Sequence, residues 1–150
     1  MKVAIGADHA GFELKERIKR LLTDKGFEVQ DVGTHSAEST DYPLYAFPVA
    51  EAVRDGVADR GILVCDSGNG IAIAANKVEG VRAALAVDPW QAEMSRRHND
   101  ANVLVLASKL TPAGEEAAIV DAWFAAPFDG GRHARRVGQI TDYERAHERR

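Results

Sequence analysis

The sequence predicts an α/β protein whose strands form one parallel sheet. Two features carry this prediction: short apolar runs alternate with segments of helical spacing along the whole chain, and the runs are almost continuously apolar. Strands of that kind are typical of parallel sheets, in which helices cover both faces. Because 150 residues, 45% of them hydrophobic, are enough to form one core, we expect a single domain over residues 1–150.

The expected strands are the apolar runs themselves. They cover residues 3–7, 27–32, 61–65, 81–87 and 103–107.

The expected helices lie between these strands and after the last one. Apolar residues recur at helical spacing in the first helix, which Gly26 ends. Residues 34–43 form a polar loop before the second helix. Thr111 and Pro112 suit the N-cap and the first position of a later helix. The six helices are expected at residues 12–22, 45–54, 71–77, 89–97, 111–124 and 131–148.

Some aromatic and histidine side chains also receive structural expectations. Trp90 and Trp123 fall at helical positions with apolar neighbours, so both are expected in the core. His35 and His133 are expected on the surface. The final helix, residues 131–148, is polar and basic enough to lie across a surface.

Composition excludes several classes of function. The net charge of −4 gives no reason to expect nucleic-acid binding, and no apolar stretch approaches the roughly 20 residues of a membrane span. The beginning of the chain does not read as a signal peptide. The single cysteine, Cys65, excludes an internal disulfide and fits a reducing cytoplasm, which is the expected location.

The segment GILVCDSGNG, residues 61–70, is the strongest candidate site. It reads as a buried strand that ends at Cys65 and then breaks into a small-residue loop before an Ala-rich helix. A loop that enters a helix N-terminus exposes several backbone N–H groups, which can bind a phosphate or stabilise an oxyanion. The local positive field is also expected to lower the pKa of the Cys65 thiol. A buried structural cysteine beside a tight turn is the alternative that this segment alone leaves open.

The topology predicts which polar clusters meet. Ligands bind at the carboxyl ends of parallel strands, so Asp8 and His9, the loop of residues 65–70, and Asp88 are expected on one rim of the sheet. Residues 98–102 precede the fifth strand and therefore belong on the opposite rim. Either the helix end before the fifth strand curls over the rim, or this segment serves the site of a neighbouring subunit; oligomerisation is the simpler explanation.

Five segments together resemble the ribose-5-phosphate isomerase B family, which includes the galactose-6-phosphate isomerase subunits. In chain order they are GADHAGFELK (6–15), TDYP (40–43), CDSGNGIAIAANK (65–77), SRRHNDANVL (95–104) and GGRHARRV (130–137). The resemblance implies a Rossmann-like three-layer α/β/α fold with a five-stranded parallel sheet. It also implies a homodimer, or a dimer of dimers, with shared active sites and a C-terminal helix that reaches the partner subunit.

The activity implied by this resemblance is an aldose–ketose isomerisation of a phosphorylated sugar, without a cofactor, through a cis-enediolate. Cys65 matches the base that moves the proton, and His98 matches the residue that helps to open the sugar ring. Another branch of the family uses a glutamate base directly after the loop, where this chain has Ile71. Ribose 5-phosphate, converted to ribulose 5-phosphate, is the leading substrate.

The resemblance implies binding roles for further residues. The backbone of the loop matches the part that holds the enediolate oxygens, at Asp66, Ser67, Gly68, Asn69 and Gly70. Substrate contacts are implied for Asp8, His9 and Lys109, and for Asn99, Arg132 and Arg136 of the partner chain. Arg132 and Arg136 are four residues apart, which places both guanidinium groups on one helical face as a phosphate clamp.

Two departures from the family pattern leave the substrate open. Asp66 stands where small residues are common, and its charge would raise the pKa of Cys65. Lys109 stands where many members have arginine, which alone offers bidentate geometry. Other tetrose, pentose or hexose phosphates therefore remain alternatives, as does a non-catalytic phosphate-binding module. The histidine and cysteine spacing predicts no metal site.

Overall fold

A computed structural model describes residues 1–148 and shows one five-stranded, all-parallel sheet with the strand order β2-β1-β3-β5-β4. The expected three-layer fold of the Rossmann type is confirmed. The strands are β1 (Lys2–Ala7), β2 (Glu28–Asp31), β3 (Arg60–Cys65), β4 (Ala83–Leu85) and β5 (Val103–Ala107).

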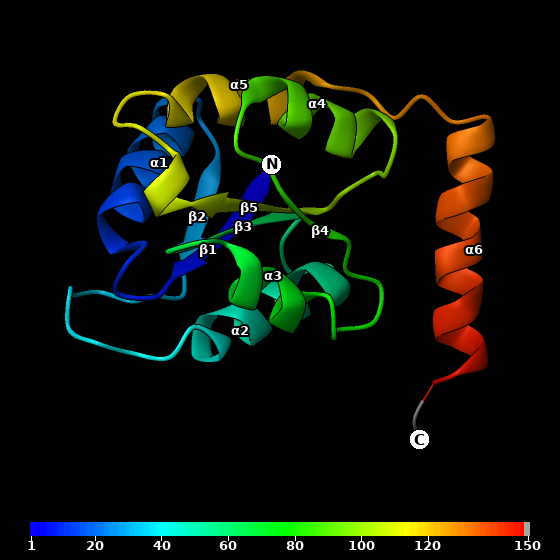
Figure 1. Ribbon diagram of the computed structural model, residues 1–150, viewed down its shortest axis with the longest axis horizontal. Helices are drawn as coiled ribbons and strands as arrows, with labels where there is room; N and C mark the ends of the chain where they lie inside the picture. Colours follow the sequence, from blue (N-terminus) through cyan, green and yellow to red (C-terminus); the bar gives the residue numbers. More distant parts are fainter. Residues whose placement is uncertain (149–150) are drawn as a thin grey trace.

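Five helices form the outer layers (Figure 1). The upper layer contains α1 (Phe12–Asp24), α4 (Pro89–Arg97) and α5 (Glu116–Ala125), and the lower layer contains α2 (Pro43–Arg54) and α3 (Asn69–Ala75). Alternate strand residues face the two layers. Ile5 and Ile62 pack with α1, α4 and α5, whereas Ala4 and Leu63 pack with α2 and α3. The continuous apolar runs therefore reflect strands that are buried on both faces.

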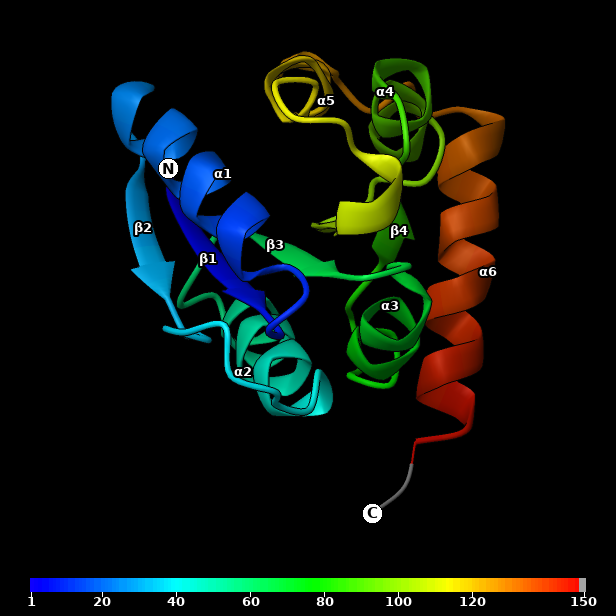
Figure 2. The same cartoon turned by 60° about the vertical axis from the view of Figure 1, so that its left-hand side comes forward.

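Helix α6 (Arg132–Ala146) lies outside these layers, alongside the β4 edge of the sheet, as Figures 1 and 2 both show. His133 is its one buried residue. Glu144 accepts a hydrogen bond from the N–H of Gly80 at 3.1 Å. A cavity of about 360 Å³ separates Ile140 of the helix from Ala83 and Ala84 of β4. Helix α6 is thus only lightly packed against its own chain.

Several element boundaries differ from the expected ones. Strands β2 and β4 are shorter than expected, and α2 and α3 each begin two residues earlier. The helix expected over residues 111–124 begins only at Glu116. Thr111 does not cap it, because its hydroxyl donates to the Ala107 carbonyl at 2.8 Å and ends a short 3₁₀ turn, Ser108–Leu110. Gly114, with φ of 95°, then reverses the chain before the helix.

The two tryptophans behave differently. Trp123 is fully buried, as expected, and packs edge-on against Phe124. The expectation for Trp90 is wrong, because 68% of it is exposed at the second position of α4. Trp90 lies in the first turn of α4, where its apolar neighbours in the sequence do not cover its side chain. Within residues 1–148, no helix combines the length and apolar character that crossing a membrane requires.

Candidate active site

The carboxyl ends of three neighbouring strands meet on one rim of the sheet. Strand β3 lies between β1 and β5, with Val64 paired to Ala7 and Cys65 paired to Ala107. The N–H of Asp8 donates to the Val64 carbonyl at 3.3 Å. Asp8 and the loop that follows Cys65 are therefore direct neighbours, as the topology predicted.

Two glycines give the Cys65 loop its close packing, one through its backbone conformation and both through the space they leave. Gly68 has φ of 78°, and a Cβ atom there would lie 2.5 Å from Cδ1 of Leu85. At Gly70 a Cβ atom would lie 2.6 Å from the ring of Tyr42. The loop is also tied to the end of β5, because the N–H of Lys109 donates to the Asp66 carbonyl at 3.1 Å.

The Cys65 thiol lies at the base of this loop and is 5% exposed. Its Sγ accepts a hydrogen bond from the N–H of Gly68 at 3.2 Å. Burial raises the pKa of the thiol above its ordinary value, while the N–H groups of Ile71 and Gly68 act in the opposite direction. The carboxylates of Asp8 and Asp66 raise it further. The expected lowering of this pKa is wrong for the single chain, because burial outweighs the backbone donors.

The polar side chains of the loop face solvent. Asp66, Ser67, Asn69 and Lys109 are all exposed, and the Ser67 hydroxyl accepts the N–H of Asn69 at 3.2 Å. The loop therefore has backbone N–H groups in its interior and polar side chains at its exposed mouth.

Asp8 and His9 form the second part of this rim. Asp8 is buried, and its carboxylate accepts the N–H of Gly11 at 3.1 Å. His9 is exposed, and its Nδ1 lies 3.1 Å from the backbone nitrogen of Thr40, which joins it to the loop of residues 34–43. Thr40 in turn shares a hydrogen bond of 2.8 Å with the Tyr45 hydroxyl.

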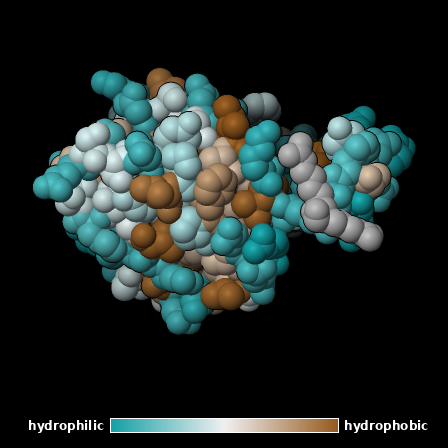
Figure 3. Space-filling view, turned by 90° about the horizontal axis from the view of Figure 1, so that it is seen from below, coloured by the Kyte–Doolittle hydropathy of each residue, from teal (hydrophilic) through white to brown (hydrophobic). Residues whose placement is uncertain are grey.

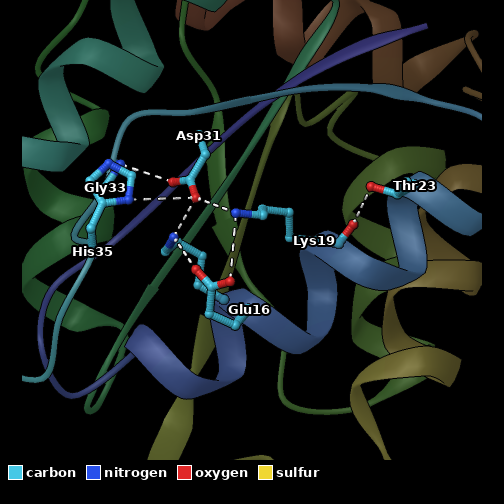
Figure 4. A network of polar contacts seen from close by, with 7 residues as sticks. Glu16, Lys19, Thr23, Asp31, Gly33 and His35 are labelled. Atoms are coloured by element: carbon cyan, nitrogen blue, oxygen red, sulfur yellow. Dashed lines mark hydrogen bonds and ion pairs between the residues drawn. The ribbon is translucent and has the colours of Figure 1, made fainter.

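A buried ion-pair network supports the β1 end of the rim (Figure 4). Lys15, which is fully buried, lies 2.7 Å from the carboxylate of Asp31, and Lys19 lies 3.0 Å from the same oxygen. The other Asp31 oxygen accepts the N–H of Gly33 at 2.9 Å. The Gly33 carbonyl then accepts the N–H of Ala7, the residue before Asp8.

His98 and Asn99 lie at the opposite rim, as expected from their place before β5. The N–H of Gly61, near the start of β3, donates to the Asn102 carbonyl at 3.0 Å. Gly61 and Cys65 are four residue steps apart along β3, which corresponds to about 13 Å. His98 and Cys65 of one chain therefore cannot act on the same carbon–carbon bond.

His98 instead joins a cluster with the start of α6. Its ring stacks on that of His133, with the ring centres 4.1 Å apart and an angle of 6° between the planes. His133 is buried, so the expectation that it lies on the surface is wrong; its ring is covered on one side by His98, which follows α4. Nitrogen atoms of both rings and a carboxylate oxygen of Asp129 lie within 4.8 Å of one another.

The charges around this cluster favour an anion over a metal cation. Arg97 already binds both oxygens of Asp129, at 3.1 and 3.2 Å. Burial lowers the pKa of His133, and the positive charges of His98, Arg132 and Arg136 lower it further. Arg132 and Arg136 themselves are exposed. The sequence analysis did not predict that Asp129 and His133 lie beside His98. The signal that could have indicated it is their position on either side of Gly130 and Gly131, where the chain turns into α6.

Comparisons with known proteins identify the family to which the chain belongs. The Ribose/Galactose Isomerase family matches residues 3–140. The chain belongs to this family.

Relatives in the Ribose/Galactose Isomerase family match nearly the full length of this chain. Ribose-5-phosphate isomerase B of Escherichia coli is 50% identical over 143 residues, which are 95% of this chain and 96% of the relative. The structure of the Clostridium thermocellum ribose-5-phosphate isomerase B is 50% identical and superposes with a TM-score of 0.96 over 99% of this chain and 100% of that one. The enzyme of Mycoplasma genitalium, solved with bound ribulose 5-phosphate, is 43% identical with a TM-score of 0.91 over 96% of each chain. As a member of this family, the chain is a sugar-phosphate isomerase of the aldose–ketose type.

Proposed function

We propose that this isomerase interconverts ribose 5-phosphate and ribulose 5-phosphate, without a cofactor, in a homodimer with two shared active sites. The observation that carries the proposal is a single buried thiol, Cys65, against a loop of backbone N–H donors. The ribulose 5-phosphate bound to the Mycoplasma genitalium relative supports the choice of substrate.

Cys65 is the proposed base. Its thiolate removes the proton from C2 of the open aldose, and the electron pair forms the C1–C2 double bond while negative charge develops on O1. The thiol then returns the proton to C1, and the proton of the C2 hydroxyl passes to O1, which leaves the ketose. Because the pKa of Cys65 is raised, forming the thiolate costs about 1.4 kcal/mol for each unit by which that pKa exceeds the solution pH.

The loop offsets part of the barrier by holding the enediolate. The oxygen that gains charge would lie near the loop N–H groups at the N-terminus of α3. Those of Gly68 and Asn69 would exchange their present partners, Sγ of Cys65 and the Ser67 hydroxyl, for this oxygen. A preorganised donor of this kind is worth about 3–4 kcal/mol in a transition state. Asp8 and His9 lie on the same rim of the sheet and would contact the sugar hydroxyls.

A second copy of the chain would supply the groups that this rim lacks. His98 is the proposed acid–base group for opening the furanose ring, because histidine is the side chain that most often acts as a general acid or base. Asn99, Arg132 and Arg136 of that copy would accompany it, with the two arginines on the phosphate. The separation of His98 from Cys65 within one chain, and the exposure of both arginines, support this arrangement.

Exposed apolar side chains on α2 and α3 form a surface against which such a second copy could pack. Figure 3 looks onto the face formed by α2 and α3 and shows apolar surface there. Leu44, Phe47 and Ile73 of these helices are 63%, 41% and 62% exposed.

Replacing the thiol gives a direct test of the proposal. We expect Cys65→Ala to abolish the exchange of the C1 proton of ribulose 5-phosphate with deuterated water, measured by NMR, while calorimetry shows that a substrate analogue still binds. Exchange by the variant at more than a few per cent of the wild-type rate would identify another base, with Asp66 the first to examine. EDTA should leave the wild-type rate unchanged.

The substrate is tested on the wild-type protein. Initial rates on aldose phosphates of four, five and six carbons should be highest for ribose 5-phosphate. A higher kcat/KM for another sugar would reassign the substrate, and binding without turnover of any sugar would indicate a phosphate-binding module.

A further inference from the structure

Asp100 has a backbone conformation that no other non-glycine residue within residues 1–148 shares. Its φ is 47°, in the left-handed region where a side chain is disfavoured. Its N–H donates to the Arg96 carbonyl at 3.2 Å, which is the hydrogen bond that closes a helix through a left-handed residue. Glycine is the usual residue at such a position, so the carboxylate must contribute something besides ending α4.

Two arginines bind that carboxylate from different elements. Nη1 of Arg96, in the last turn of α4, lies 2.9 Å from one oxygen. Nη2 of Arg82, just before β4, lies 3.3 Å from the other, and Nε of Arg82 donates to the Asp100 carbonyl at 2.9 Å.

The same arginines are anchored in the fold. Arg96 is 8% exposed, and its Nη1 also donates to the Ala101 carbonyl at 2.7 Å. The N–H of Arg82 donates to the side chain of Asn102 at 2.7 Å. Asp100 is therefore fixed to the end of α4, the start of β4 and the entry to β5 at once.

His98 and Asn99 are the two residues between the last turn of α4 and this anchor. The N–H of His98 still donates to the Met94 carbonyl at 2.8 Å, so the chain leaves the helix only after it. The left-handed φ of Asp100 turns the chain from the end of α4 toward β5, so Asp100 fixes the far end of the short segment that carries His98. His98 then meets His133 in a nearly parallel stack.

We propose that Asp100 is a positioning residue whose left-handed backbone and two-arginine clamp aim the imidazole of His98 at the sugar ring. This inference rests on the proposed function, in which His98 opens the ring. It assigns to Asp100, Arg82 and Arg96 the task of keeping that imidazole oriented before substrate binds.

Two substitutions separate the backbone from the clamp. Asp100→Gly keeps the left-handed conformation but removes the carboxylate, whereas Asp100→Asn tolerates the conformation and keeps one acceptor oxygen for the arginines. Asp55→Gly is the matched control, because Asp55 also follows a helix and binds an arginine, Arg54 at 2.8 Å, on the exposed end of α2.

Two reactions separate ring opening from proton transfer. An aldopentose 5-phosphate closes to a furanose, whereas a ketopentose 5-phosphate cannot, because its O5 is esterified. Turnover of ribose 5-phosphate therefore requires ring opening, and deuterium exchange at C1 of ribulose 5-phosphate requires only proton transfer.

We expect Asp100→Gly to lower kcat for ribose 5-phosphate by roughly tenfold to a hundredfold, with little change in KM or in the exchange rate, because a misaimed group loses its advantage in rate. Asp100→Asn should recover most of the loss, and Asp55→Gly should behave as wild type. An equal fall in both reactions, or wild-type turnover by Asp100→Gly, would overturn the inference.

His98→Asn distinguishes a failure of this inference from a failure of the proposed function. If that variant turns over ribose 5-phosphate normally, the role of His98 itself is wrong. If it loses turnover while Asp100→Gly does not, only the positioning role of Asp100 is wrong.

Discussion

Two opposed effects act on the pKa of the Cys65 thiol. Burial favours the neutral thiol, and the backbone donors of the loop favour the thiolate. Since burial dominates, the folded chain holds the thiol proton more tightly than an unfolded chain does. The associated stabilisation is present at neutral pH and is lost as the pH rises through the raised pKa.

This direction of the pKa gives a prediction for chemical modification. Alkylation by iodoacetamide requires the thiolate, so its rate at Cys65 should rise with pH to a midpoint above that of a free cysteine, about 8.5. The rate is measured by mass spectrometry of the single cysteine over a pH series, with free cysteine as the reference. A midpoint below that of free cysteine would show that the loop donors outweigh burial.

Sequence reasoning at the residue scale succeeded where chemistry is local. The loop after Cys65, with its strand, its two restricted glycines and its helix, lies where the pattern predicted it. Trp90 and His133 could not be assigned in this way, because their exposure depends on how α4 and α6 lie relative to the rest of the chain.

At the scale of elements, the network around Asp31 joins α1 to the end of β2. Burial opposes the charge of Asp31, yet hydrogen bonds from Lys15, Gly33 and Lys19 hold the pKa of that carboxyl below its usual range. The stabilisation it contributes is present above the unfolded pKa and disappears as the pH falls through the lowered value.

We expect Lys15→Met to destabilise the protein by about 3 kcal/mol, because it leaves the half-buried Asp31 with only Lys19 as a charged partner. Lys19→Met is the matched control: Lys19 is 37% exposed, so its loss should cost well under half as much. Urea unfolding followed by circular dichroism measures both. Equal losses in the two variants would show that burial of the ion pair is unimportant.

The elements that sequence patterns placed well are those with a single dominant signal. The apolar runs located all five strands, although the ends of β2 and β4 were overestimated. The start of α5 was misplaced because Thr111 and Pro112 look like a helix start, while the side chain of Thr111 bonds backward to Ala107.

At the scale of the whole molecule, the two rims of the sheet carry complementary halves of the proposed site. A two-fold dimer would bring the Cys65 rim of one copy to the His98 rim of the other, twice. The sequence pattern predicted this separation, and the parallel direction of the strands explains it: Cys65 ends β3, whereas His98 precedes the neighbouring strand β5.

Shared sites predict that two inactive variants restore one another. When Cys65→Ala and Arg136→Ala chains are refolded together, one site of each mixed dimer regains both the thiol and the complete clamp, so a mixed dimer should approach about half of the wild-type activity. Each variant refolded alone is the baseline, and Arg135→Ala, next to the clamp, should stay active by itself. Mixed dimers as inactive as their parents would place the clamp and the thiol in the same chain.

The positions in the loop after Cys65 differ in how much room they leave for a side chain. Any side chain at position 68 or 70 collides with Leu85 or Tyr42, whereas positions 66, 67 and 69 point their side chains outward. Substitutions at positions 66, 67 and 69 should therefore change which sugar the proposed site accepts while the shape of the loop beneath them is kept.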